Sequence, residues 1–377
     1  TVWAFATAGM QTGRLFDLVA ETAVTRLHEF TSQALANTAW AFATAEAKAP
    51  VLFDAVAERA VTRLDDFTPQ ALANTVWSFA KAGADAPELF DAVAEEAVKR
   101  LDKFTSRDLA NTVWAFATAG ASAPKLFDAV AERAVKCLNT FNSQDIANMV
   151  WAFATAKATS PRLFDAMAET AMTRVDGFTP QELTNTVWAF ATAGMQTGRL
   201  FDLVAETAVT RLHEFTSQAL ANTAWAFATA EAKAPVLFDA VAERAVTRLD
   251  DFTPQALANT VWSFAKAGAD APELFDAVAE EAVKRLDKFT SRDLANTVWA
   301  FATAGASAPK LFDAVAERAV KCLNTFNSQD IANMVWAFAT AKATSPRLFD
   351  AMAETAMTRV DGFTPQELTN TVWAFAT

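Results

Sequence analysis

The chain has 377 residues, 52% of them hydrophobic and 20% charged, which is typical of a folded protein with room for two or three globular domains. Its apolar runs are far shorter than the roughly 20 residues of a membrane helix, so we expect no membrane partner. A net charge of −12 argues against a nucleic-acid binder unless the acidic residues lie on a face away from the ligand. The chain begins with Thr1 in the middle of a motif, so we expect a fragment without its targeting segment.

A single repeat accounts for the whole chain. The 11 tryptophans are 37 residues apart, which is the signature of a repeat architecture. Residues 1–185 recur unchanged as 186–370, and residues 371–377 restate residues 1–7. The expected units are a partial repeat 1–29, the full repeats 30–66, 67–103, 104–140, 141–177, 178–214, 215–251, 252–288, 289–325 and 326–362, and a partial repeat 363–377.

The sequence of each module predicts two helices in succession, as module 67–103 illustrates. Thr68 can cap the start of the first helix, and Pro69 suits its first position. Gly83 is placed to end that helix. Pro87 then opens a second helix of about fourteen residues. In three modules an acid, Asp108, Asp145 or Glu182, can complete a capping box or complement the helix dipole.

A hairpin of two such helices cannot bury both of its faces alone, so stacking on neighbouring modules is obligatory. No segment alternates with period two over the length of a strand, and no Gly, Ser or Pro linker interrupts the array. The sequence therefore predicts an all-α fold, a superhelix of 37-residue helix-turn-helix repeats that forms one continuous α-solenoid over residues 1–377.

The two helices differ in their polar faces. At 100° per residue, Gln70, Asn74 and Thr75 fall on the polar side of the first helix, which is nearly uncharged. Acids such as Asp91 and Glu95 form an outer stripe on the second helix. Solenoids of this kind usually place the first helix on the concave surface. The groove is then lined by amides and hydroxyls suited to hydrogen-bonding a polar ligand, and most of the acidic charge lies outside it.

Two alternatives to ligand binding remain open on the first helix. The asparagine that recurs in every module can instead form an intramolecular ladder, each amide bonding to the next module, because a stack must satisfy its polar groups. The pair near the helix start changes from Gln70 and Ala71 to Arg107 and Asp108 in the next module, which fits modular readout and also random drift. Trp77 lies at the edge of the apolar arc, so we expect it in the core between modules and not in a base-stacking platform.

The arginines late in the second helix also have two interpretations. They recur at equivalent positions and can reach phosphates, but ion pairs four residues apart are a sufficient structural reason for them, as in Glu96 with Arg100. Cys137 replaces the arginine in one module, and Cys322 is its copy. We expect both to be free thiols in a reducing compartment.

Catalytic signatures are absent from the sequence. His28 and His213 are one position in two copies, and with the two cysteines they form no cluster of metal-ligand spacing. Phosphate-binding loops and nucleophile elbows are also missing. The repeated carboxylates form a solvated face. We expect no enzymatic activity, no catalytic residue, no metal and no cofactor.

The motif LANTVWAFATAG at 109–120, followed by a P-x-LFDAVAE segment and repeated every 37 residues, resembles the heptatricopeptide and octotricopeptide repeats of organelle proteins. The resemblance implies a right-handed solenoid that binds single-stranded RNA in its concave groove, about one nucleotide per repeat, in organellar RNA processing, stability or translation. It also implies a mitochondrial or chloroplast location. No RAP domain, which often accompanies these repeats, is present. The implied base-facing residues are Gln33, Asn37, Thr38, Gln70, Asn74, Thr75, Arg107, Asp108, Asn111, Thr112, Gln144, Asp145, Asn148, Gln181, Glu182, Asn185, Gln218, Asn222, Gln255, Asn259, Arg292, Asp293, Asn296, Gln329, Asp330, Asn333, Gln366, Glu367 and Asn370.

Two further functions compete with RNA binding. The first is a scaffold that grips an extended peptide with its amides, although here Asn111 precedes Trp114, the reverse of the order in armadillo repeats. The second is a structural polymer. The partial repeats at the two ends are in phase and lack capping modules, so end-to-end self-association is a possible interaction.

Overall fold

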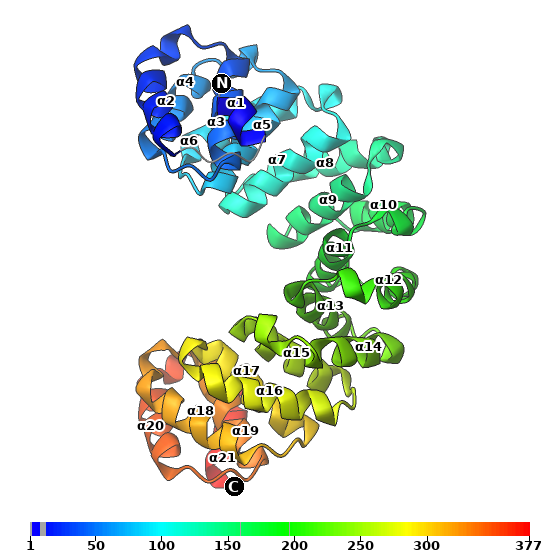
Figure 1. The fold of residues 1–377 in the computed structure, drawn as a ribbon, viewed down its shortest axis with the longest axis vertical. Coiled ribbons are helices and arrows are strands. Elements are labelled where there is room, and N and C mark those ends of the chain that lie inside the picture. The colour runs from blue at the N-terminus through cyan, green and yellow to red at the C-terminus, as the bar shows by residue number, and fades with distance from the viewer. Residues whose placement is uncertain (1, 8–12, 159, 196) are drawn as a thin grey trace. The chain divides into compact units, whose positions relative to one another are not determined.

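The computed structural model describes residues 2–7, 13–158, 160–195 and 197–377. Within these ranges all regular structure is helical and no strand occurs, which confirms the predicted all-α class. The chain forms two compact units, residues 1–200 and 201–377, and each is an array of helical hairpins (Figure 1). Continuity of the solenoid over the whole chain stays a prediction.

The helices of the first unit alternate between first and second helices of successive modules. They are α1 (Val2–Thr7), α2 (Gly13–Arg26), α3 (Ser32–Thr44), α4 (Pro50–Val61), α5 (Pro69–Ala82), α6 (Pro87–Lys99), α7 (Ser106–Ala119), α8 (Pro124–Lys136), α9 (Ser143–Thr155), α10 (Pro161–Met172) and α11 (Pro180–Thr192). The unit boundary falls within α12 (Gly198–Arg211). Short 3₁₀ helices follow the second helices: η1 (Leu27–Glu29), η2 (Leu64–Asp66), η3 (Leu101–Lys103), η4 (Leu138–Thr140) and η5 (Val175–Gly177).

The second unit repeats the same alternation. Its helices are α13 (Ser217–Thr229), α14 (Pro235–Val246), α15 (Pro254–Ala267), α16 (Pro272–Arg285), α17 (Ser291–Ala304), α18 (Pro309–Lys321), α19 (Ser328–Thr340), α20 (Pro346–Met357) and α21 (Pro365–Ala376). The 3₁₀ helices are η6 (Leu212–Glu214), η7 (Leu249–Asp251), η8 (Leu286–Lys288), η9 (Leu323–Thr325) and η10 (Val360–Gly362).

The first helix of each module begins as its sequence predicts. In α5 the Thr68 hydroxyl accepts a hydrogen bond from the Ala71 N–H at 3.1 Å, and Pro69 occupies the first helical turn. A capped N–H and a residue whose φ is already helical both favour initiation at this point. Residues within the first turn therefore fix where each first helix begins.

First helices end on a residue with positive φ. Gly83 has φ of 65° after α5, and the Ala84 N–H donates to the Phe79 carbonyl at 3.0 Å, which satisfies a carbonyl of the last turn. This confirms the predicted glycine end. In other modules the same place is taken by Glu46 with φ of 51° and Lys157 with φ of 53°, where a side chain makes the left-handed conformation unfavourable.

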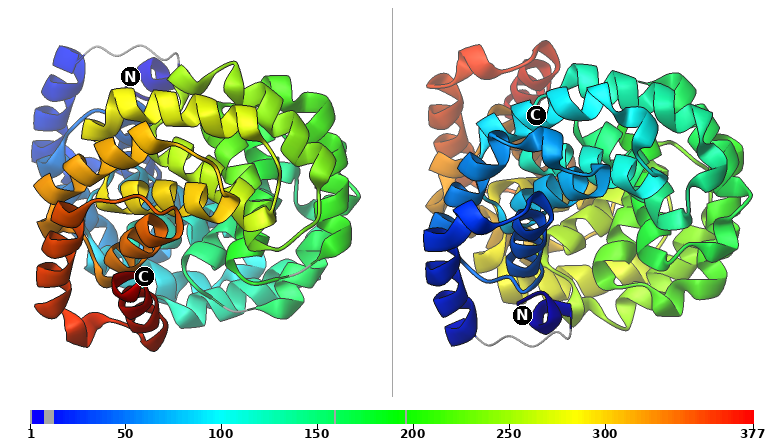
Figure 2. Two further views of the ribbon diagram at one scale, coloured as in Figure 1. Left: turned by 90° about the horizontal axis from the view of Figure 1, so that it is seen from below. Right: turned by 90° about the horizontal axis from the view of Figure 1, so that it is seen from above.

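The helices of each unit lie in two layers. Successive first helices, such as α5, α7 and α9, pack closely on one another, whereas successive second helices make far fewer contacts. Small side chains permit this close approach: Thr75 and Ser78 of α5 are fully buried. Because one layer is tight and the other is spread, each array curves with its first helices on the inside. Figures 1 and 2 show the succession of hairpins.

Aromatic pairs join each module to the next. Phe53 on α4 meets Phe79 on α5 edge to face, with ring centroids 5.0 Å apart, and Phe90 meets Phe116 in the same way. This arrangement is the preferred geometry of an aromatic pair. The core is therefore built between modules, which is why a single module cannot fold alone.

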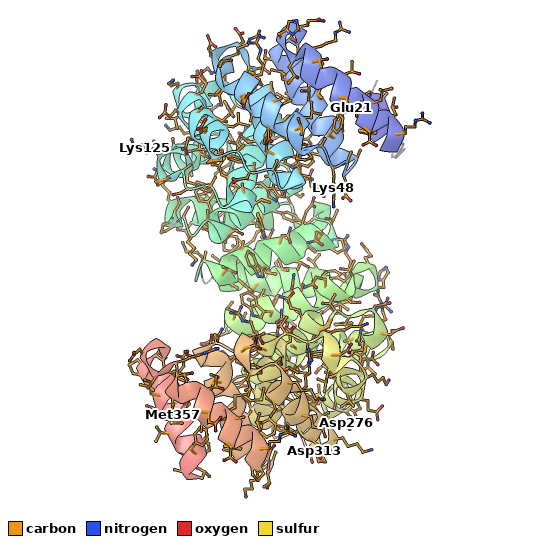
Figure 3. The ribbon with its side chains drawn as sticks, turned by 90° about the vertical axis from the view of Figure 1, so that its left-hand side faces the viewer. Glu21, Lys48, Lys125, Asp276, Asp313 and Met357 are labelled. Carbon is orange, nitrogen blue, oxygen red and sulfur yellow. The ribbon has the colours of Figure 1, made fainter. Side chains whose placement is uncertain are left out.

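Charge is concentrated on the second helices, as the sequence predicts. Figure 3 shows the side chains of Glu21, Asp276 and Asp313 projecting from α2, α16 and α18. All three are exposed, as are Asp91 and Glu95 of α6. The inner layer of first helices therefore carries little of the acidic charge.

Candidate functional site

A polar strip runs along the solvent-facing side of the first helices. In α5, Gln70 is exposed, and Asn74 and Trp77 are half-exposed. Spacings of four and three residues place the three side chains on one face of the helix. We call this surface the inner strip. Its members in the remaining modules are Gln33, Asn37 and Trp40; Arg107, Asn111 and Trp114; Gln144, Asn148 and Trp151; Gln181, Asn185 and Trp188; Gln218, Asn222 and Trp225; Gln255, Asn259 and Trp262; Arg292, Asn296 and Trp299; Gln329, Asn333 and Trp336; and Gln366, Asn370 and Trp373.

The asparagine amides of the inner strip form no ladder between modules. In three modules the amide accepts from the glutamine four residues earlier, as Asn185 does from Gln181 at 2.9 Å. Each of these bonds stays within one helix. Among the described residues the remaining asparagine side chains have no protein partner: Asn37, Asn74, Asn111, Asn148, Asn259, Asn296 and Asn333. Their amides are open to solvent and to a ligand.

The threonines that follow these asparagines are not part of the strip. Thr75 is fully buried, and its hydroxyl donates to the Ala71 carbonyl at 2.7 Å. Thr38 and Thr112 are also buried and make the same bond at 2.7 Å. They lie where consecutive first helices approach each other, and a hydroxyl that bonds to its own helix needs no other partner. This placement corrects the expectation that these threonines face a ligand.

The carboxylates at the starts of the first helices also form hydrogen bonds within the protein. The Asp108 carboxylate accepts from the Thr105 N–H at 3.0 Å and from its hydroxyl at 2.7 Å, closing the predicted capping box. Asp108, Asp145, Asp293 and Asp330 are buried, whereas Glu182 and Glu367 are half-exposed. All six close capping boxes. In the variable pair near the helix start, such as Arg107 and Asp108, the first residue therefore points outward and the second caps the helix. This placement corrects the expectation that the buried aspartates face a base.

Burial perturbs two of these carboxyls. Loss of solvent raises the pKa of Asp145 and of its copy Asp330 above 3.8, while the Asn142 N–H and the Arg107 charge oppose that rise at Asp145. A buried carboxylate that keeps one backbone donor is still destabilised by lost hydration. These aspartates therefore serve the helix starts at an electrostatic cost.

The tryptophans belong to the strip, which the sequence reasoning missed. Centroids of Trp77 and Trp114 are 6.1 Å apart with ring planes at 30°, and Trp114 and Trp151 repeat this at 6.1 Å and 32°. The rings thus pack on each other while staying half-exposed. The indole N–H of each of these three has no protein partner and is not enclosed. The sequence did contain a signal for this placement: each tryptophan follows a solvent-facing asparagine by three residues, a spacing that puts both on one face of the helix.

The family model of the RNA-editing substrate-binding complex 8 protein, RESC8, matches residues 58–377, well over half of the chain. The chain belongs to the RESC8 family. The search of curated proteins found no match. A chain of the "Homology model of the full-length AP-3 complex in an intermediate open conformation" is 10% identical and aligns over 99% of this chain and 72% of its own, with a TM-score of 0.33. That score is too low to bear on fold or function.

Most arginines of the second helices are bonded to the protein itself. Arg100 pairs with Glu96 at 2.8 Å, the ion pair that the sequence predicts. It also donates to the Phe67 carbonyl at the start of its own module at 2.9 Å and to the Leu64 carbonyl of the preceding module at 3.1 Å. Arg63 and Arg174 make the same bond, to the carbonyls of Phe30 and Phe141 at the starts of their own modules. The guanidinium groups of these arginines are engaged by backbone carbonyls, so they are poorly placed to bind phosphate.

Few cations remain on the first helices of the described chain. Lys81 pairs with Glu46 of the preceding module at 3.5 Å, and the copy of this pair is at 3.4 Å. Arg107 and its copy Arg292 are exposed and make no ion pair or hydrogen bond within the described chain. They are therefore the two free cations that the described first helices present.

Other types of site are less well supported. Clefts recur between the loops that join first and second helices, and the one lined by Phe42, Lys48 and Gly83 is representative. The linings of five such clefts contain no predicted site residue. The described residues include no group of three potential metal ligands. No described helix is both long and apolar enough to cross a bilayer.

Proposed function

We propose that the inner strip of each unit binds single-stranded RNA, with about one nucleotide per module. The observation that carries this proposal is the row of solvent-facing asparagine amides, one per module and seven of them without a protein partner, beside outward Gln or Arg side chains. Helical repeat proteins read single-stranded bases with two or three side chains per repeat, by hydrogen bonds to the base edges. The family description, an RNA-editing substrate-binding complex protein, supports RNA as the ligand.

The distribution of charge supports this proposal despite the net charge of −12. The acids of the first helices close capping boxes, and many of the other acids, such as Asp91, are exposed on second helices. An RNA strand on the inner layer thus avoids most carboxylates. Each phosphate neutralised on a single strand contributes about −0.7 to the slope of log affinity against log salt. With Arg107 and Arg292 as the two free cations, we expect a total slope of roughly −1.4.

We infer that the protein catalyses no reaction itself and acts in a mitochondrion or chloroplast as part of RNA maturation. The resemblance to organellar repeat proteins supports the compartment. Peptide binding by the same amides, and association of chains end to end, are the alternatives; the uncharged character of the strip suits a peptide backbone as well as a base.

The experiment is selection of bound sequences from a random RNA pool at two salt concentrations. Because the five-module block occurs twice in the sequence, the expected result is one five-letter word repeated in tandem, with affinity that falls gently as salt rises. A double variant with Asn111→Asp and Asn296→Asp should lose this selection, because it adds repulsive charge to the strip. Absence of RNA binding by the unaltered chain would overturn the proposal and favour a peptide ligand.

A further inference from the structure

One position of the inner strip changes its chemistry once in each five-module block. It is an exposed glutamine in eight modules, for example Gln70 and Gln144, and an exposed arginine at Arg107 and Arg292. The adjacent asparagine, Asn111 beside Arg107, does not change. The strip is therefore uniform except for one guanidinium in each unit.

The two side chains recognise different groups. A guanidinium presents parallel N–H donors and no acceptor, which matches the N7 and O6 acceptors of guanine. A glutamine amide offers one donor and one acceptor, which matches the donor and acceptor of adenine. Because Arg107 makes no ion pair or hydrogen bond in the described chain, its donors are available to a ligand.

We propose that Arg107 and Arg292 each select a guanine in the bound RNA, while the glutamine modules select against it. This inference rests on the proposed RNA-binding function. It assigns one guanine to each five-letter word, at the letter read by module 104–140 and again by module 289–325. The neighbouring Asp108 plays no part in the selection, because its carboxylate is buried in the capping box with Thr105.

A structural role for Arg107 is the rival explanation. Its charge acts on Asp145 of the next module and opposes the rise of that group's pKa, and Ser106 and Asp108 also act on the same carboxyl. Arg292 stands in the same relation to Asp330. If arginine is present only to balance a buried aspartate, its loss will lower stability and leave the RNA preference unchanged.

The test compares three forms of the full chain in RNA selection: the unaltered chain, Arg107→Gln with Arg292→Gln, and Asp108→Ala with Asp293→Ala. The arginine variant should lose the guanine from each word, with a change in preference of about 5- to 150-fold per site. The aspartate variant should keep the guanine and lose only thermal stability. A gain variant, Gln70→Arg with Gln255→Arg, should add a second guanine beside the first.

A chemical probe removes dependence on protein variants. RNA carrying 7-deazaguanine at the selected letter lacks the N7 acceptor, so it should bind the unaltered chain more weakly and the arginine variant equally. A guanine preference that survives Arg107→Gln, or a variant that only melts earlier, overturns this inference while RNA binding stands. Failure of the unaltered chain to bind any RNA overturns the proposed function as well.

Discussion

Arg100 donates to the carbonyl oxygen of Phe67, the first residue of its own module, at 2.9 Å, and to that of Leu64 in the preceding module, at 3.1 Å. Its position in the next module is occupied by Cys137, whose thiol instead contacts the Arg133 carbonyl of its own helix at 3.2 Å. The module that carries Cys137 thus lacks the bond from the end of the second helix to the first residue of the module that six other modules have.

Replacing both cysteines, Cys137→Arg with Cys322→Arg, should stabilise the protein. The new guanidinium can donate to the carbonyl of Phe104, as Arg100 does to that of Phe67, and a hydrogen bond from a charged donor contributes about 1–2 kcal/mol at a half-exposed site. The measurement is the thermal unfolding midpoint. Arg100→Cys is the matched control and should lower the midpoint by a similar amount. An unchanged midpoint in both variants would show that the bond to the phenylalanine carbonyl adds no stability.

Glycine in place of lysine at the positive-φ residue that ends a first helix should also stabilise the protein. Lys157 has φ of 53° at the place where Gly120 has φ of 66°. Lys157→Gly removes the clash of a side chain with the backbone, at the expense of a more flexible unfolded chain, for a net gain of about 0.5–1 kcal/mol. Denaturant unfolding measures this gain. The reverse change, Gly120→Lys, should cost a comparable amount, and a destabilised Lys157→Gly variant would contradict the argument.

The buried aspartates predict a specific dependence of stability on pH. Burial raises the pKa of Asp145 and Asp330 in the folded state, so the folded chain binds more protons there than the unfolded chain. Their contribution to the free energy of unfolding therefore falls as pH rises from about 4 towards 7. Asp145→Asn with Asp330→Asn should become more stable relative to the unaltered chain over that range, as measured by unfolding at several pH values.

The opposite sign is expected at an exposed ion pair, which serves as the control. A hydrogen bond from Arg211 lowers the pKa of Glu214, so its contribution is present above the ordinary pKa and is lost as pH falls. Glu214→Gln should therefore be slightly less stable than the unaltered chain near neutral pH, and this difference in the free energy of unfolding should disappear in acid. If the aspartate and glutamate variants respond to pH in the same direction, the assignment of burial as the cause is wrong.

Neighbouring polar residues of α5 should differ in their effect on RNA binding. Thr75 is buried with its hydroxyl bonded to the Ala71 carbonyl, whereas the Asn74 amide is open. Thr75→Val should leave RNA affinity unchanged and alter stability by less than about 1 kcal/mol. Asn74→Asp should weaken RNA binding about tenfold, since it places a negative charge against the strand. Titration of labelled RNA measures both, and equal losses would contradict the assigned orientation.

The tryptophans offer a separate readout. Trp77→Phe with Trp262→Phe keeps a ring at each place but removes the indole N–H, which has no protein partner. The variant should fold, as circular dichroism will show, and should bind RNA more weakly by about 0.5–1.5 kcal/mol if the N–H donates to the ligand. Unchanged affinity would assign these tryptophans to packing between modules alone.

The sequence by itself determined the repeat, the helices and their ends. Tryptophans 37 residues apart defined the module, and Thr68, Pro69 and Gly83 act as the predicted start and stop of α5 because capping depends only on residues within a few positions. The capping role of Asp108 was predicted for the same reason. Local chemistry of this kind needs no knowledge of the neighbouring modules.

Only the tertiary structure decided which polar residues face a ligand. A helical wheel places Asn74 and Thr75 on one polar side, but the next first helix packs so closely that it covers Thr75 and leaves Asn74 open. The same packing leaves Trp77 half-exposed, although its apolar ring suggested the core. Burial depends on the distance between helices that are 37 residues apart in the chain, and the periodicity of one helix does not contain that distance.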